Sequence, residues 1–376
     1  MIMATTLTKR SVPYFNYQQA FTDREDELIE IVRDVLRRGA FIQQRDLVDF
    51  EQRLAAYLGV KHAIGVGNAT DGLHFAWRAA GLRAGDEVIL CSHTMAATAA
   101  GIHFAGGTPI PVEVGADRCI DPRSVRAAIT SRTRALCPTQ LNGRTANMDE
   151  LQAIADEHGL FILEDAAQAL GSSFKGRRAG TFGVAAAFSF YPAKILGCPG
   201  DGGAVVTNDD EIAEKVLRLR DHGRSPDGDV VEWGLNSRLD NLFAAILSWR
   251  FNDYDRVIAR RRAVAAMYDA GLSGVQELGL PPAPGADPNH FDVYQNYEIE
   301  AERRDELRDF LLAAGIGSLI QWSGKPLHHW TVLAGRVSLP ATDRFFERCI
   351  MLPLNTMISD EDVEHVIDTV RQFYGY

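Results

Sequence analysis

The sequence predicts an α/β protein with a mainly parallel sheet and a second, smaller α/β domain. Short apolar strands alternate with amphipathic helices over residues 58–165, which is typical of a parallel sheet covered on both faces. The 376 residues exceed one ordinary domain, and a Pro/Gly-rich connector, LPPAPGADPN, lies at residues 280–289. We therefore expect a large domain at residues 1–255 and a small domain at residues 256–376.

The elements of the large domain can be predicted in order along the chain. Apolar residues at helical spacing predict two helices, at residues 24–38 and 46–58, ahead of a first strand within LGVKHAIGVG. The alternation that follows predicts helices at residues 71–82, 95–106, 121–129 and 148–159, and strands at residues 87–92, 108–114, 135–140 and 160–165.

After residue 165 the alternation breaks. Strands are expected at 184–191 and 202–208, close enough for the sheet to change direction or to add an antiparallel strand. A helix at 210–223 follows, and one long helix at 239–264 is expected to leave the large domain. The small domain should contain strands at residues 293–300 and 317–322, and helices at residues 304–316 and 360–374.

Composition and charge exclude several classes of protein. The formal net charge of −11 would repel nucleic acid and anionic lipid. No apolar stretch approaches 18 residues, and the N-terminus lacks a signal-peptide pattern. The five cysteines are widely spaced without a CxxC pair, which indicates free thiols in a reducing compartment. We expect a cytoplasmic protein without nucleic-acid or membrane partners.

Asp165 and Lys194 are the two residues that most strongly suggest chemistry. Ligands of open α/β sheets bind at the carboxyl ends of strands, and Asp165 ends an apolar strand, where a carboxylate needs a cationic partner. Its alternative role is a helix N-cap on DAAQAL. Lys194, in SFYPAKILG, is flanked by aromatic and apolar residues that would lower its pKa; its alternative role is a snorkelling surface lysine.

Together the two residues suggest a cofactor. Pyridoxal 5′-phosphate (PLP) needs a lysine for its aldehyde and an acid that keeps its pyridine nitrogen protonated. A phosphate cradle could come from the backbone amide of Ala69, the hydroxyl of Thr70 and the hydroxyl of Ser189. The glycine-rich string GCPGDGG has neither GxGxxG nor Walker spacing, which argues against a dinucleotide or P-loop site.

Several long strings now point to one family. They are GNATDGL, TSRTRALCPTQLNGRTANMDEL, LEDAAQALGSSFKGRRAGTFG, FSFYPAKILGCPGDGGAVVTND, GLNSRLDNLFAAIL and MLPLN. Over nearly its whole length the chain resembles the DegT/DnrJ/EryC1/StrS family of PLP-dependent sugar aminotransferases. The resemblance implies the PLP-dependent transferase fold type I, with a mixed, mainly parallel seven-stranded sheet in the large domain.

The resemblance also implies roles for individual residues. Lys194 would carry the cofactor as a Schiff base, and Asp165 would face the pyridine nitrogen. Gln168 would contact the ring face or O3′, while Ser189 and Thr70 would hold the phosphate. We expect the large domain to make all contacts to PLP, and we expect no metal ion in the site.

A partner and a reaction are implied as well. Asn236, in GLNSRLD, would reach the cofactor phosphate of a neighbouring subunit, which implies an obligate homodimer. The expected reaction moves an amino group from an amino acid, L-glutamate, to a nucleotide-linked keto-sugar, with carbon 3 favoured over carbon 4. The alternatives are amination of a keto-cyclitol or a free keto-sugar, and a non-catalytic PLP- or sugar-binding regulator; relatives that dehydrate sugars carry His in place of Lys194.

The chain departs from the family pattern in the cofactor region. Ala69 replaces the usual Gly of the phosphate turn, so this turn must tolerate a Cβ atom. Met95 stands where relatives place an aromatic residue, and its thioether can lie on the pyridine ring. The alternative is that Met95 belongs to the core and His93 stacks on the ring.

A third departure concerns the sugar site. Where relatives carry a His-Tyr-Pro string, this chain reads LIQWSGKPLHHW. Its polar and aromatic side chains are the candidate substrate residues Gln321, Trp322, Lys325, His328 and His329. His93 is a candidate substrate residue as well. At least one of the two histidines is expected to form a plain surface turn. Lys325 is the candidate to engage a sugar acid or a diphosphate.

Overall fold

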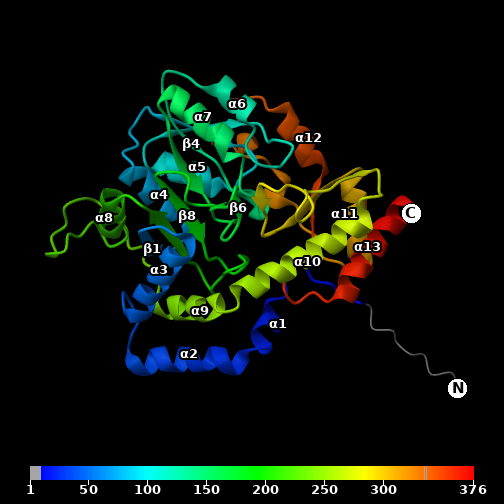
Figure 1. Cartoon of the computed structure of the whole chain (residues 1–376), viewed down its shortest axis with the longest axis horizontal. Coiled ribbons are helices and arrows are strands. Elements are labelled where there is room, and N and C mark those ends of the chain that lie inside the picture. Colours follow the sequence, from blue (N-terminus) through cyan, green and yellow to red (C-terminus); the bar gives the residue numbers. More distant parts are fainter. Residues whose placement is uncertain (1–9, 334, 336) are drawn as a thin grey trace.

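A mixed seven-stranded sheet forms the centre of the larger, N-terminal part of the molecule (Figure 1). The computed structural model describes residues 10–333, 335 and 337–376. The strand order is β1-β9-β8-β5-β4-β2-β3, and only the two pairs made by β9 are antiparallel. The strands are β1 (His62–Val66), β2 (Glu87–Cys91), β3 (Thr108–Val112), β4 (Thr133–Cys137), β5 (Phe161–Asp165), β8 (Ala185–Ser189) and β9 (Gly203–Thr207). This confirms the predicted fold class, and of the two alternatives for the strands after residue 165 the sheet adds an antiparallel strand.

Helices cover both faces of this sheet. They are α3 (Arg45–Leu58), α4 (Ala69–Ala79), α5 (Ala96–Phe104), α6 (Pro122–Ala128), α7 (Met148–His158), α8 (Asp210–Leu219) and α9 (Asn241–Phe251). Helix α2 (Glu25–Arg38) packs on α9, and α1 (Tyr17–Thr22) packs on α2. Adjacent strand residues point to opposite faces: Leu90 packs in the core with residues of α4, α5 and α8, whereas Ile89 packs with residues of α6 and α7. Within the described residues, no helix is long and apolar enough to cross a membrane.

A second, smaller group of elements follows along the chain. The long helix α10 (Tyr254–Leu272) leads from the large sheet towards α11 (Arg304–Ala313) and α13 (Asp360–Tyr374) (Figure 1). These helices pack on a three-stranded sheet in the order β10-β12-β13. Its strands are β10 (Leu278–Gly279), β12 (Tyr297–Ala301) and β13 (Cys349–Leu352). The domain boundary at residues 255/256 stays a proposal; it lies in the first turn of α10.

The remaining short elements connect these two groups. A small antiparallel sheet in the order β11-β6-β7 joins segments from both. These elements are β6 (Ser173–Phe174), β7 (Arg177–Arg178), β11 (His290–Phe291), the 3₁₀ turns η1 (Leu141–Gly143), η2 (Gln321–Gly324) and η3 (Leu327–His329), and helix α12 (Pro340–Arg348). All five cysteines are buried and unpaired, as the sequence predicted.

Two predicted elements are wrong. The single helix at residues 239–264 is divided into α9 and α10 at Asn252 and Asp253. Their side chains accept hydrogen bonds from Arg53 and Arg24 of the N-terminal helices, which favours a break in the helix here. The strand predicted at 317–322 forms only an isolated bridge and then turns into η2. Helix α12 and strand β13 were not predicted.

Candidate active site

Four adjacent strands end at one edge of the large sheet, where the candidates Asp165 and Ser189 lie. In the order β8, β5, β4 and β2, the carboxyl ends of these strands lead to Ser189, Asp165, Thr139 and Ser92. Lys194 follows β8 by five residues and lies in a turn. This is the sheet edge at which open α/β folds bind ligands.

Lys194 is half-buried. Burial lowers the pKa of its ammonium group from 10.5 to about 8, although the nearby Asp165 carboxylate opposes this shift. A larger fraction of the amine is therefore neutral near physiological pH than for an ordinary surface lysine. A neutral amine is the nucleophilic form.

Asp165 is buried, and several groups favour its charged form. Burial raises the pKa of its carboxyl group, while Thr98, the amide of Ala167 and the charge of Lys194 lower it; the net direction is upward. Thr98 donates to Oδ2 at 2.6 Å and the Ala167 amide donates to Oδ1 at 3.1 Å. The alternative that Asp165 caps a helix is wrong, because the residues after it form turns.

Thr98, which donates to Asp165, belongs to a row of buried threonine hydroxyl groups that contact one another. Thr98 of α5 contacts Thr94 at 2.7 Å, and Thr94 contacts Thr139 at 2.8 Å between their Oγ1 atoms. Sequence reasoning did not identify Thr98 as a site residue. Its signal was one hydroxyl in a helix turn otherwise built of alanine and glycine, AATAAG.

The start of α4 has the features of a phosphate cradle. Asn68 caps this helix by accepting from the Asp71 amide at 2.9 Å, so Ala69 and Thr70 are its first residues. The first amides of a helix lack intrahelical partners and favour an anion. A Cβ atom at Gly203 would lie 2.7 Å from the Ala69 nitrogen, so glycine is needed where β9 approaches the start of α4. Ala69 has helical geometry, and the turn therefore tolerates its Cβ atom.

Gln168 is buried with its amide oxygen engaged by protein donors. The backbone amide of Asn142 donates to Oε1 at 2.9 Å, and Asn296 Nδ2 donates to the same atom at 3.4 Å. The Oε1 atom faces these two donors. The Nε2 group is the end of the side chain that can donate to a ligand.

Met95 and His93 occupy very different environments. Met95 is 49% exposed, so the alternative that places it in the core is wrong. His93 is fully buried, with Nε2 2.9 Å from Glu298 Oε2 and Nδ1 accepting from the Trp322 indole at 3.1 Å. Both ring nitrogens of His93 therefore have protein partners, and of the two residues Met95 is the more accessible.

The candidate sugar residues divide into buried and accessible ones. Gln321 is buried and donates to Asn142 Oδ1 at 2.6 Å, so its amide nitrogen is committed to a protein contact. Trp322 is half-buried and donates to His93. Lys325 is exposed. Asn236, predicted to act across a subunit interface, is also exposed.

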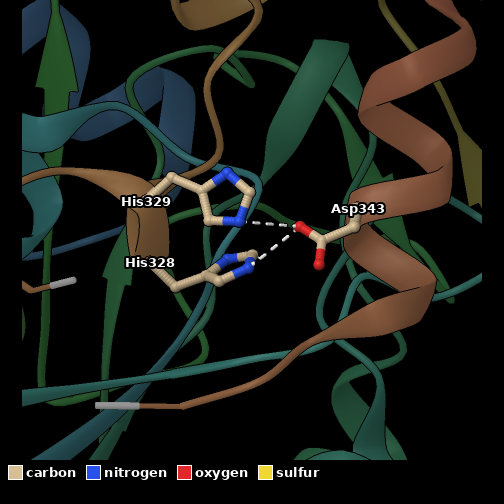
Figure 2. A group of neighbouring side chains, drawn as sticks. All are labelled: His328, His329 and Asp343. Atoms are coloured by element: carbon tan, nitrogen blue, oxygen red, sulfur yellow. Dashed lines mark hydrogen bonds and ion pairs between the residues drawn. The ribbon is translucent and has the colours of Figure 1, made fainter. Parts of the chain in front are cut away.

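His328 and His329 both face Asp343 of α12 (Figure 2). Their Nε2 atoms lie 3.1 and 3.0 Å from the same Oδ1 atom, and Ser92 Oγ lies 2.7 Å from Nδ1 of His328. Burial, and then the neighbouring His329, lower the pKa of His328. His328 is buried and His329 is exposed, so the two imidazoles fasten this segment to α12 while one histidine lies at the surface, as predicted.

These residues fit PLP. A half-buried lysine with a lowered pKa stands near a buried carboxylate, and a helix start suited to phosphate lies at the same sheet edge. Fold and site together define a PLP-dependent transferase of fold type I. The model of the DegT/DnrJ/EryC1/StrS aminotransferase family matches residues 22–371, so the chain belongs to that family and is a PLP-dependent aminotransferase.

Individual relatives agree over their full length. The chain is 42% identical over 368 residues to a dTDP-3-amino-3,4,6-trideoxy-alpha-D-glucose transaminase of Streptomyces venezuelae, covering 96% of each chain. It is 38% identical to a pleiotropic regulatory protein of Geobacillus stearothermophilus, covering 97% of this chain and 99% of the relative. The crystal structure of S. venezuelae DesV in complex with a ketimine intermediate superposes with a TM-score of 0.93 at 41% identity, covering 97% and 99% of the two chains.

Proposed function

We propose that this chain transfers the amino group of L-glutamate to carbon 3 of a nucleotide-linked keto-hexose. One observation carries the proposal: Asp165 ends strand β5 and Lys194 follows the adjacent strand β8, beside a helix start suited to a phosphate. The Streptomyces venezuelae relative is named for a dTDP-linked 3-amino sugar, which supports both the nucleotide and carbon 3.

Each site residue then has a defined task. Lys194 would hold the cofactor, and as a neutral amine its Nζ would accept and return the proton of the substrate carbon. Asp165 holds a proton at the pyridine nitrogen. Bound PLP supplies the electron-withdrawing ring that stabilises negative charge on the substrate carbon. Ser189, Thr70 and the α4 amides bind the phosphate.

The amino donor and the acceptor use this machinery in turn. With PLP bound, the site would take the amino group of L-glutamate, which becomes its 2-keto acid, and would then pass that group to the ketone of the sugar. Exposed Lys325 is our candidate contact for the diphosphate of the nucleotide, because a flexible ammonium group can pair with phosphate oxygens. Gln321, by contrast, already donates to Asn142.

A homodimer is part of the proposal. The segment next to Asn236 exposes large apolar side chains, and Trp233 is 87% exposed. The apolar side chains of this surface are Val230, Val231, Trp233 and Leu235. Such exposed groups are typical of a protein interface, and a second copy seated here would carry Asn236 towards its neighbour's site.

Mixing two inactive variants tests this arrangement. Chains carrying Lys194→Ala and chains carrying Asn236→Ala are exchanged in equal amounts. If Asn236 acts across the interface, each hybrid dimer has one undamaged site, and random exchange should restore about one quarter of parental activity. Subunit exchange is checked by the mass of differently tagged chains. No recovery after confirmed exchange would place both residues in the same chain's site.

A panel of ketones tests the acceptor. The enzyme is first converted to the pyridoxamine form with L-glutamate, and loss of pyridoxamine absorbance is then followed in single turnovers. We expect the fastest reaction with a nucleotide-linked 3-keto-hexose. A faster reaction with a 4-keto isomer would overturn the ring position, and a faster reaction with a free keto-sugar or a keto-cyclitol would overturn the requirement for a nucleotide.

The same experiment addresses a non-catalytic regulator. A regulator that only binds PLP would leave the cofactor unchanged when L-glutamate is added. Conversion to the pyridoxamine form, without any keto-sugar present, would exclude that alternative. Conversion by another amino acid alone would change the proposed donor and leave the acceptor proposal intact.

A further inference from the structure

The side chain of Gln295 spans the peptide groups on either side of Lys194. Its Oε1 atom accepts from the Ile195 amide at 3.0 Å, and its Nε2 atom donates to the Ala193 carbonyl at 2.8 Å. Gln295 is buried and belongs to the segment that leads into β12. A residue distant in sequence thus fixes the backbone from which Lys194 projects.

The next residue, Asn296, acts on the other side of the candidate site. Its Nδ2 group donates to Asn142 Oδ1 at 2.8 Å and to Gln168 Oε1 at 3.4 Å. The Asn142 amide also donates to Gln168 Oε1, at 2.9 Å. These contacts hold the oxygen of the Gln168 amide towards the protein, so its Nε2 group is directed to the other side.

Asn142 is itself held in one orientation. Its Nδ2 group donates to Glu298 Oε2 at 2.7 Å, and its Oδ1 atom accepts from Gln321 at 2.6 Å. Burial opposes ionisation of Glu298, but His93, Arg118 and the Asn142 hydrogen bond together hold its pKa below the ordinary value. An ionised carboxylate only accepts hydrogen bonds, so the Asn142 amide cannot flip without losing both contacts.

The backbone here is also constrained. Tyr294 and Asn142 both have positive φ angles, at 52° and 55°, which non-glycine residues rarely adopt. A Cβ atom at Gly143 would lie 2.6 Å from the Gln295 nitrogen, so the two segments touch. Arg261 of α10 donates to the carbonyl oxygens of Tyr294 at 2.7 Å and Gln295 at 2.6 Å. Strained residues held by such contacts often mark functional sites.

We propose that Gln295 and Asn296 are positioning residues of the aminotransferase site. Gln295 sets the direction of Lys194, and Asn296, through Asn142, presents the Gln168 amide nitrogen to the cofactor. The segment before β12 thereby couples the C-terminal sheet to the geometry of the cofactor site. This inference rests on the proposed roles of Lys194 and Gln168.

The first test compares two buried amides that each link a backbone amide and a backbone carbonyl. Gln295→Met removes both contacts at Lys194 with little change in volume. The matched control is Asn241→Leu, because Asn241 also accepts from a backbone amide, of Leu47, and donates to a backbone carbonyl, of Ala40; it donates to Asp46 as well. We expect PLP capture by the apoprotein to slow by about 10-fold or more in Gln295→Met and to stay near the parental rate in the control.

Thermal unfolding of both apoproteins shows whether they are equally destabilised. Equal losses of stability with slow capture only in Gln295→Met support positioning. Parental capture in both variants, or equally slow capture in both, would overturn it, because the Gln295 contacts would then serve only the fold. A variant that fails to fold is replaced by Gln295→Glu, which keeps the acceptor for Ile195 and loses the donor to Ala193.

The second test addresses Asn296 through the spectrum of the bound cofactor. Asn296→Leu should shift the pH at which the absorbance of Lys194-bound PLP changes, while the capture rate stays within about twofold of the parent. An unchanged absorbance profile would remove Asn296 from this role. Both tests use PLP without any sugar, so they can succeed even if the proposed acceptor is wrong; failure of the parent protein to fix PLP at Lys194 would instead overturn the proposed site.

Discussion

Lys194→Ala is expected to abolish transamination while PLP still binds reversibly. The phosphate and ring contacts come from other residues, whereas the half-buried amine with a pKa of about 8 is the nucleophile of the candidate site. We expect turnover to fall by roughly 10³-fold or more, which corresponds to about 4 kcal/mol of barrier. The measurements are glutamate-dependent turnover and equilibrium binding of PLP.

Borohydride trapping identifies the lysine directly. Reduction of the parent holoenzyme should fix PLP to the peptide that contains Lys194, and the variant should retain no fixed label. Lys215→Ala is the matched control. Lys215 is also half-buried, but its amine donates to the carbonyl of Arg78, which lies outside the candidate site. Label on another lysine of the parent would contradict the assignment.

The alternation of strands and helices made most of the large sheet predictable. Each strand of the first part is short and apolar, and helices such as α3 and α4 carry one apolar face, so local sequence and final burial agree. The antiparallel strand β9 was signalled by its short distance from β8. The helix at 239–264 failed because Asn252 and Asp253 are fixed by arginines more than 190 residues away in sequence, which a local pattern cannot reveal.

The C-terminal part was less predictable for a related reason. Trp322 and Ser323 both have positive φ angles, at 54° and 58°, so the expected strand ends in a tight turn. The Trp322 indole donates to buried His93, and Gln321 donates to Asn142. Tertiary contacts of this kind override local strand propensity.

In the candidate site, too, local features were predictable from the sequence and long-range contacts were not. Asp165 and Lys194 were predictable because strand ends and apolar flanks are local features of the sequence. Thr98, Gln295 and Asn296 were not, because their roles depend on contacts between elements separated by 67, 100 and 128 residues. Sequence reasoning thus found the residues expected to touch the cofactor and missed those that hold them in place.

Asp165→Asn should leave the fold intact and cut turnover by about 10²-fold or more, close to 2.7 kcal/mol of barrier. A neutral amide cannot stabilise a protonated pyridine nitrogen, and that proton is what allows the ring to withdraw electrons. The amide oxygen can accept from the Ala167 N–H, and the amide NH2 can donate to the Thr98 hydroxyl, which now contacts Oδ2 at 2.6 Å, so packing changes little. Turnover within about threefold of the parent would remove Asp165 from this role.

The same variant has a second readout that does not depend on turnover. The Asp165 charge raises the pKa of Lys194 against the larger, opposite effect of burial. Without that charge the pKa should fall further below about 8, and more of the amine is neutral at a given pH. The rate of PLP capture by the apoprotein should therefore rise with pH through a lower midpoint in Asp165→Asn than in the parent. A midpoint at the parental pH or above it would mean that the two side chains are not electrostatically coupled.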